Sequence, residues 1–309
     1  MRISITLRAL LNTLLLSAVL PPLTAVAQPA PTLPEMKFVE VPAGARDKFI
    51  GDRFSYMETG KPDAPAVLLL HGIGANSFYW RFQYRVLGER YRVVAWNAPG
   101  YLLTDNLKKE RPTCNDYADA LAAFADAVGV GRAAVIGNSF GSAVAQCYAE
   151  RYPARVERMA LSGTSVGSIT TPVDEREKVF ERRQKQFERA GGMGYARDVI
   201  GLLLGSKAEP WVKPEVMAVL AGTNGPAYLR ASFVAYELDS LAFAPRIKIP
   251  VLLVHGTEDK IAPIERTSVA LSKVLPNAKL VRLEGHGHLP EVEAWPRVNP
   301  LLLEFLGSK

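Results

Sequence analysis

One serine in the sequence is flanked by glycines at the spacing that a nucleophile on a tight turn needs. Residues 137–141 are Gly-Asn-Ser-Phe-Gly, and they lie between a short apolar run and an Ala-rich stretch. This order predicts a strand, a sharp turn and a helix, because glycines before and after the serine let strand and helix approach closely. Such a turn exposes the Ser139 hydroxyl and directs the Phe140 amide toward an oxyanion. The pattern therefore predicts a nucleophile at Ser139 and an oxyanion donor at Phe140.

A nucleophilic serine needs a base, and the base needs an acid that orients it. The chain has four histidines, two of which follow the last predicted strand, in residues 285–288. The acidic pair Glu258 and Asp259 follows the strand before it. All three roles then fall at the carboxyl ends of strands, where open α/β sheets form their sites. We expect Asp259 to orient His288, and His288 to take the proton of Ser139.

His286 is the alternative base. It lies two residues from His288, so the two side chains face opposite sides if the loop is extended. Pro290 and the acidic residues Glu291 and Glu293 suit the first turn of a following helix. This places His288 next to the helix at the sheet edge, and we interpret His286 as a loop residue bonded to backbone.

A second oxyanion donor is expected in residues 71–76, His-Gly-Ile-Gly-Ala-Asn, which follow the continuous apolar run 66–70. Such a run is typical of a strand buried on both faces. The glycines leave backbone amides available, and we expect the Ile73 amide to face the oxyanion. A plain turn after the strand is the alternative interpretation. His71, at the end of the strand, is interpreted as structural.

Predicted strands and helices alternate up to about residue 162, which calls for a mostly parallel sheet with helices on both faces. The alternation stops in residues 168–247, where the pattern is helical and in part highly charged. We expect a helical cap there, inserted between two parts of an α/β core, 36–167 and 248–309. The residues expected to contact substrate are Gly72 and Asn138 beside the turn and four cap aromatics, Phe180, Phe187, Trp211 and Phe233.

Residues 1–27 have the features of a signal peptide. Arg2 and Arg8 accompany an apolar core, residues 9–20, which two prolines end before the small residues 25–27. The core is short for a membrane span, although an uncleaved anchor is the alternative. Residues 28–35 are a Pro-rich linker. We expect export to the periplasm or the medium, with a mature chain that begins at Gln28 and is not bound to the membrane.

The composition of the chain limits the classes of partner that we expect the protein to bind. The 309 residues carry a formal net charge of +6, with 48% hydrophobic and 22% charged residues. The basic residues are scattered, so we expect no nucleic-acid surface. No spacing indicates a metal site, no cofactor is expected, and the oligomeric state stays open. Cys114 and Cys147 could pair after export. However, Cys147 suits a small buried position in the helix after the serine, and we expect two free thiols.

From about residue 36 to 307 the chain resembles the capped α/β-hydrolase family. The stretches similar to the family's motifs are 71–74, 92–101, 137–141, 256–259 and 287–288, in that order. The resemblance implies an α/β-hydrolase fold with a serine hydrolase triad and no cofactor. It implies cleavage of a small carboxylic ester or related acyl substrate through an acyl-enzyme.

Two alternatives remain. Asn138 is similar to the branch of the family that hydrolyses carbon–carbon bonds in ring-cleavage diketones, whereas Leu289 stands where that branch usually carries Trp. The other alternative is a ligand-binding protein that kept the fold and lost the chemistry.

Overall fold

The computed structural model of the chain describes residues 32–308. The predicted signal peptide and residues 28–31 of the predicted linker lie outside the described residues. In the part that is described, no helix is both long and apolar enough to cross a membrane.

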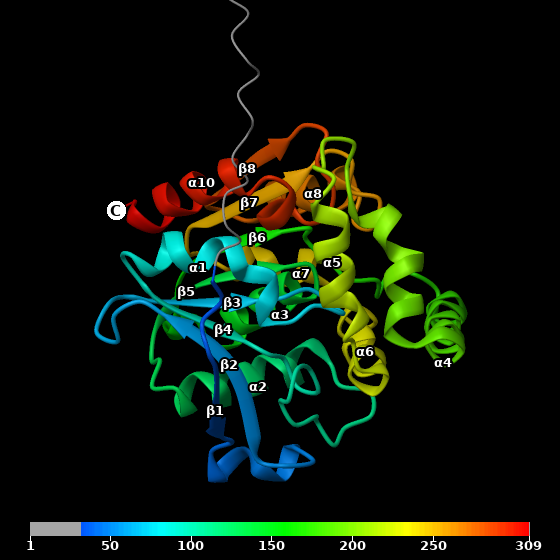
Figure 1. The fold of residues 1–309 in the computed structure, drawn as a ribbon, viewed down its shortest axis with the longest axis horizontal. Helices are drawn as coiled ribbons and strands as arrows, with labels where there is room; N and C mark the ends of the chain where they lie inside the picture. The colour runs from blue at the N-terminus through cyan, green and yellow to red at the C-terminus, as the bar shows by residue number, and fades with distance from the viewer. Residues whose placement is uncertain (1–31, 309) are drawn as a thin grey trace, which may run out of the picture. The chain divides into compact units, whose positions relative to one another are not determined.

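Within residues 32–308, eight strands form one sheet in the spatial order β1-β2-β4-β3-β5-β6-β7-β8 (Figure 1). β1 (Met36–Glu40) and β2 (Arg53–Thr59) are antiparallel to their neighbours, and the later pairs are parallel. The parallel strands are β3 (Ala66–Leu70), β4 (Arg92–Trp96), β5 (Ala133–Asn138), β6 (Val156–Ser162), β7 (Val251–Gly256) and β8 (Ala278–Leu283). The inner strands are almost wholly buried, because helices cover both faces.

The helices divide between the two faces of the sheet. The core helices are α1 (Arg81–Gly88), α2 (Cys114–Ala127), α3 (Phe140–Arg151), α8 (Ser268–Val274), α9 (Pro290–Glu293) and α10 (Trp295–Gly307). α2, α3 and α8 contribute to one apolar core, whereas α1 and α10 contribute to the other (Figure 1). Short 3-10 helices complete the connections: η1 (Ala43–Lys48), η2 (Ser77–Trp80), η3 (Pro153–Arg155), η4 (Phe233–Ala235), η5 (Ala244–Arg246) and η6 (Ile264–Arg266).

A helical insertion separates β6 from β7. It consists of α4 (Val173–Leu203), α5 (Val212–Ala221) and α6 (Gly225–Ser232), and α7 (Ser240–Phe243) leads back to the sheet. α4 and α5 are packed together at the carboxyl side of the sheet (Figure 1). α4 is interrupted at Gly191, whose φ of 58° and ψ of −162° are not helical, so α4 consists of two helical halves. The mostly parallel sheet, its two helix layers and this insertion confirm the predicted fold class.

A disulfide joins Cys114, the first residue of α2, to Cys147 in α3, with Cα atoms 6.1 Å apart. The expectation of two free thiols is therefore wrong. α2 and α3 pack side by side on the same face of the sheet, which brings together cysteines that are 33 positions apart in the sequence. The bond thus ties the helix that follows Ser139 to its neighbour.

We predict that the disulfide contributes about 3–4 kcal/mol to the free energy of unfolding, because a cross-link across 33 positions restricts the unfolded chain. Reductant should lower the denaturation midpoint of the wild type. The matched control is the double variant C114A/C147A, whose midpoint should already be low and should not respond to reductant. Alkylation of two thiols in the unreduced, unfolded protein would show that the bond is absent.

Candidate active site

Ser139 sits on a strained turn between β5 and α3. Its φ of 54° is in the left-handed region, which non-glycine residues rarely adopt. A Cβ at Gly137 would lie 2.5 Å from the carbonyl oxygen of Gly141, and a Cβ at Gly141 would lie 2.1 Å from that of Leu70. Both positions therefore require glycine, and the strand, turn and helix approach each other as the spacing predicts.

Two backbone amides lie near the serine. Phe140 is the first residue of α3, and the amides of Ser142 and Ala143, which come after it, already donate to the Ser139 carbonyl. An amide at the first position of a helix has no intrahelical acceptor. Ile73 and Phe140 both border a cavity with Ser139. The structure thus brings both predicted oxyanion donors to the nucleophile's side of the sheet.

His71 holds the loop that contains Ile73. Its Nε2 accepts from the Ala98 amide at 3.1 Å, so its Nδ1–H donates to the Gly72 carbonyl at 2.8 Å. The side chain is fully buried. Burial lowers the pKa of His71 to about 4, although the hydrogen bond to Gly72 opposes the shift. His71 is therefore neutral at physiological pH, and its fixed tautomer sets the position of the loop.

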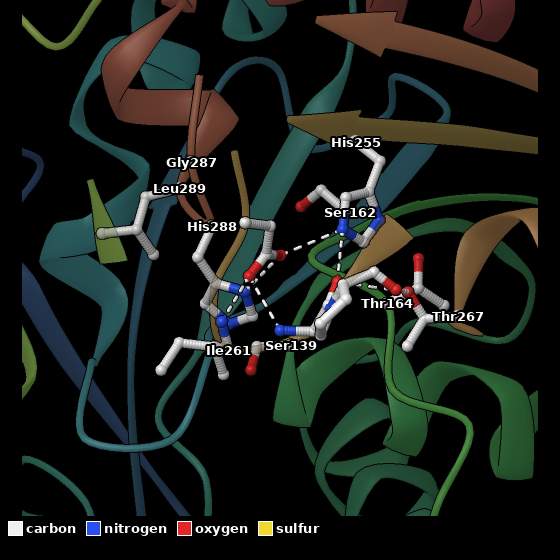
Figure 2. Close-up of polar contacts among 12 residues, drawn as sticks. Ser139, Ser162, Thr164, His255, Ile261, Thr267, Gly287, His288 and Leu289 are labelled. Carbon is white, nitrogen blue, oxygen red and sulfur yellow. Dashed lines mark hydrogen bonds and ion pairs between the residues drawn. The ribbon is translucent and has the colours of Figure 1, made fainter. Parts of the chain in front are cut away.

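Asp259 and His288 form a buried pair. The Nδ1 of His288 lies 2.7 Å from Oδ2 of Asp259, and Oδ1 accepts from the amides of Ile261 and Ala262 at 2.8 Å each. Nε2 of His255 lies 3.0 Å from the same Oδ2, so two histidines converge on this carboxylate (Figure 2). Burial acts to raise the pKa of Asp259, but the hydrogen bonds from His255 and His288 outweigh it and hold the pKa well below its usual range. Asp259 is therefore an anion.

His286 lies apart from this pair. Its Nδ1 contacts the backbone carbonyl of Glu284 at 3.1 Å. The structure thus brings His288, and not His286, to Asp259.

His255 belongs to a hydrogen-bonded chain that sequence reasoning missed. Its Nε2 faces two acceptors, Asp259 and the Ala262 carbonyl at 2.8 Å, so this nitrogen carries the proton. Its Nδ1 lies 2.7 Å from Ser268 Oγ, which in turn bonds Thr164. A histidine at the end of a strand, four residues before the acid, is the signal that could have pointed to it.

Three parts of the chain position His288, two through its backbone and one through its ring. Its amide donates to the Leu203 carbonyl at 2.7 Å, and its carbonyl accepts from the Asn138 side-chain amide at 3.1 Å. A Cβ at Gly163 would lie 2.8 Å from Cε1 of His288, so only glycine leaves room for the imidazole. The ring is therefore positioned by the cap, the nucleophile turn and the loop after β6.

Glu293 organises the loop that carries His288. Its carboxylate accepts from the amides of Gly287 at 3.0 Å, Leu289 at 3.2 Å and Gly205 at 2.8 Å. Gly205 follows the end of α4, so one carboxylate ties the histidine loop to the cap. The sequence marked Glu293 as a first-turn acid, and its backbone partners depend on the tertiary fold.

A cavity of about 840 Å³ lies between the sheet edge and the cap, and Ser139, His288, Ile73, Gly72 and Asn138 all line it. A second cavity of about 540 Å³ also borders Ser139, His288 and Ile73. The nucleophile therefore lies where two cavities meet. Asn138 uses its amide group in bonds to Ser162 Oγ and the His288 carbonyl, and hence acts in part as an internal brace.

The four cap aromatics expected to contact substrate lie outside the lining of both cavities. Phe180 and Phe233 pack on each other with ring centroids 4.3 Å apart, Phe187 stacks on Tyr228, and Trp211 packs on Phe82. Phe180, Phe187 and Phe233 pack between elements instead, and Trp211 is exposed. The apolar residues that the cap contributes to the larger cavity are at helical spacing, namely Val199, Leu202, Leu203, Val216, Val219 and Leu220, and charged residues of α4 also line it. The helical spacing of these apolar residues is the signal in the sequence that could have identified them as cavity-lining residues.

Comparison with known proteins gives consistent matches. The profile of the alpha/beta hydrolase fold family matches residues 65–293. The chain is 27% identical over 266 residues to the bifunctional esterase/perhydrolase DCH of Acinetobacter calcoaceticus, covering 82% of this chain and 95% of that protein. It is 26% identical over 264 residues to a 2-hydroxy-6-oxononadienedioate/2-hydroxy-6-oxononatrienedioate hydrolase of Burkholderia vietnamiensis, covering 82% and 91%. A thermophilic esterase from Thermogutta terrifontis has a similar fold, with a TM-score of 0.75 at 23% identity over 88% of this chain and 98% of that one.

We predict that the free energy of unfolding falls as the pH drops from about 6.5 to 4. Over this range the unfolded state binds a proton at residue 71 that the folded state excludes, because the folded pKa of His71 is about 4 and the unfolded value is ordinary. The expected loss is about 3 kcal/mol. Urea unfolding across this range should show a steeper pH dependence for the wild type than for His71→Gln. Parallel curves for the two proteins would contradict the burial of a neutral histidine.

Proposed function

Because the chain belongs to the α/β-hydrolase fold family, we propose that it is a serine hydrolase that cleaves a small carboxylic ester or a related acyl substrate. The observation that carries this proposal is the 2.7 Å contact between His288 Nδ1 and Asp259, at the cavity that Ser139 also lines. An anionic Asp259 accepts the Nδ1 proton, so Nε2 of neutral His288 is left as a proton acceptor.

In the proposed reaction, Ser139 Oγ attacks the ester carbonyl while His288 Nε2 takes the serine proton. The amides of Ile73 and Phe140 stabilise the oxyanion, and each such donor is typically worth about 3 kcal/mol in the transition state. His288 then gives the proton to the departing alcohol. Water, activated by the same histidine, hydrolyses the acyl-enzyme and restores Ser139. Asp259 keeps His288 in the required tautomer and stabilises its charged form.

The alternative is hydrolysis of a carbon–carbon bond in a ring-cleavage-type diketone. The similarity to the Burkholderia vietnamiensis hydrolase and the presence of Asn138 before the nucleophile favour it. The ester proposal is supported by the similarity to the Acinetobacter esterase/perhydrolase. The hydrogen bonds of Asn138 also support it. The side-chain NH2 group of Asn138 donates to Ser162 Oγ and to the His288 carbonyl, so it already has acceptors within the protein.

We predict that Ser139→Ala abolishes labelling by a fluorophosphonate and lowers the hydrolysis of 4-nitrophenyl butyrate by several orders of magnitude, with an unchanged circular dichroism spectrum. The matched control is Ser142→Ala, one turn further along α3, which should still be labelled. Labelling that persists in Ser139→Ala would move the nucleophile elsewhere. Turnover of a vinylogous diketone without turnover of the ester would favour carbon–carbon hydrolysis, and a wild type that neither labels nor turns over would favour a binding protein.

We further propose that the protein is exported. The signal-peptide features of residues 1–27 support this, and so does the Cys114–Cys147 disulfide, since such bonds persist mainly in oxidising compartments. Intact-mass analysis of the protein purified from its native host should give a chain that begins at Gln28. Retention of Met1 or Arg2 would contradict removal of the segment.

A further inference from the structure

The larger cavity carries an excess of positive charge. Among the described residues, six Lys and Arg side chains line it, and four of these have ionic partners. The pairs are Arg81–Glu215, Lys178–Asp174, Lys185–Glu181 and Arg189–Asp198. Arg182 and Arg183 have no ion-pair partner within residues 32–308. The cap therefore presents two uncompensated guanidinium groups to the cavity.

These two arginines differ in their surroundings. Arg182 is exposed, whereas Arg183 is half-buried. Arg183 also lines the second cavity, as do Ser139 and His288. This cation therefore borders both of the cavities that the nucleophile and the base border.

The tyrosines near Arg183 are neutral, so they do not neutralise its positive charge. Tyr195 and Tyr228 line the larger cavity, with ring centroids 4.7 Å apart. Burial raises the pKa of Tyr228, and the positive charge of Arg183 only partly opposes this shift. The tyrosine is therefore neutral at physiological pH. A half-buried guanidinium that forms no ion pair with the described residues, and that has neutral tyrosines near it, matches an anionic ligand, because its planar fork binds carboxylates in bidentate fashion.

The two cavities differ in chemistry. In the larger cavity, the second half of α4 and α5 contribute valines and leucines, whereas the first half of α4 contributes most of the charged side chains. The second cavity is rich in hydroxyl groups, contributed by Thr164, Ser165, Thr170, Thr171, Ser232 and Thr267. Exposed Arg266 also lines it. An apolar group fits the part of the larger cavity that the valines and leucines line, and a charged polar group fits the second cavity, which Arg183 also lines.

We propose that Arg183 binds a carboxylate on the acyl part of the substrate, so that the substrate class is the monoesters of short dicarboxylic acids with an apolar alcohol. This inference rests on the proposed ester hydrolysis. The apolar alcohol occupies the larger cavity, and the acyl chain with its carboxylate extends from Ser139 toward Arg183 and the second cavity. Water adds its oxygen to the acyl carbon, one of its protons goes to the alcohol oxygen and the other is released to solvent, so the products are a dicarboxylate, a free alcohol and a proton.

The first test compares 4-nitrophenyl hydrogen glutarate with its neutral match, 4-nitrophenyl methyl glutarate. We expect the wild type to favour the anionic ester by about 10-fold or more in kcat/KM, since hydrogen bonds to charged groups commonly contribute such factors. Arg183→Gln should bring the ratio close to one, and Arg183→Lys should retain part of it. The matched control is Arg197→Gln, an exposed arginine of α4 that lines neither cavity, which should keep the wild-type ratio. A wild-type ratio near one, or a ratio that Arg183→Gln does not change, would overturn the proposal and leave ester hydrolysis standing.

A second test measures binding without turnover. Calorimetry with monobutyl glutarate should give a Kd about 10-fold lower for Ser139→Ala than for Ser139→Ala/Arg183→Gln. Equal affinities, or no binding to either protein, would overturn the anion site. If this difference is found while the wild type hydrolyses neither ester, the anion site stands and the proposed ester hydrolysis fails. Thermal unfolding of each Arg183 variant verifies that it is folded.

Discussion

The buried charge of Asp259 is the constraint on which the site depends. A carboxylate in this position is stable only if its oxygens are hydrogen-bonded, because burial otherwise favours the neutral acid. The amides of Ile261 and Ala262 satisfy one oxygen, and the imidazoles of His255 and His288 meet the other. Each partner comes from a fixed element: the turn after β7, the end of β7 itself and the loop after β8. The carboxylate therefore requires β7, β8 and their loops to keep one relative position.

Carboxylates also organise the second layer of the site. Glu293 collects three amides, two from the histidine loop and one from Gly205 at the end of α4. Glu291 is fully buried and accepts from Tyr79 at 2.7 Å, and burial raises its pKa. The loop around His288 thus has little regular secondary structure of its own, and it is positioned by side-chain acceptors instead. This arrangement combines glycines, which permit tight backbone paths, with acids, which hold those paths in place.

The fold could be predicted because its signals are local. Continuous apolar runs such as 66–70 and 251–254 identify buried strands, and the order of strands and helices then limits the topology. The turn at Ser139 was likewise readable from five adjacent residues. The positions of Asp259 and His288 needed one further rule, that parallel strands end at the same edge of the sheet. These features are all set by periodicity and spacing.

The remaining features are the disulfide, the residues that line the cavity and the partners of His255 and Glu293. They depend on contacts in three dimensions that the spacing of residues along the sequence does not specify. The Cys114–Cys147 bond follows from how α2 and α3 pack, which the sequence of either helix does not reveal. Phe180 and Phe187 lie on a helix whose rotation about its axis decides which side chains meet the cavity, and aromatic residues gain more by packing between helices. The bonds of His255 and Glu293 join residues to backbone groups from distant loops, so their partners become visible only in three dimensions.

The interruption of α4 at Gly191 divides this helix into two halves that differ in how they are attached to the rest of the protein. The half after Gly191 is fastened to the site, because the Leu203 carbonyl accepts from His288 and the nearby Gly205 amide donates to Glu293. A displacement of that half would carry the backbone of His288 with it and separate the base from the nucleophile. The half before Gly191, which carries Arg183, has no such attachment to the histidine loop. The two halves of α4 therefore differ in their relation to the base, because these bonds transmit a displacement of the second half to His288.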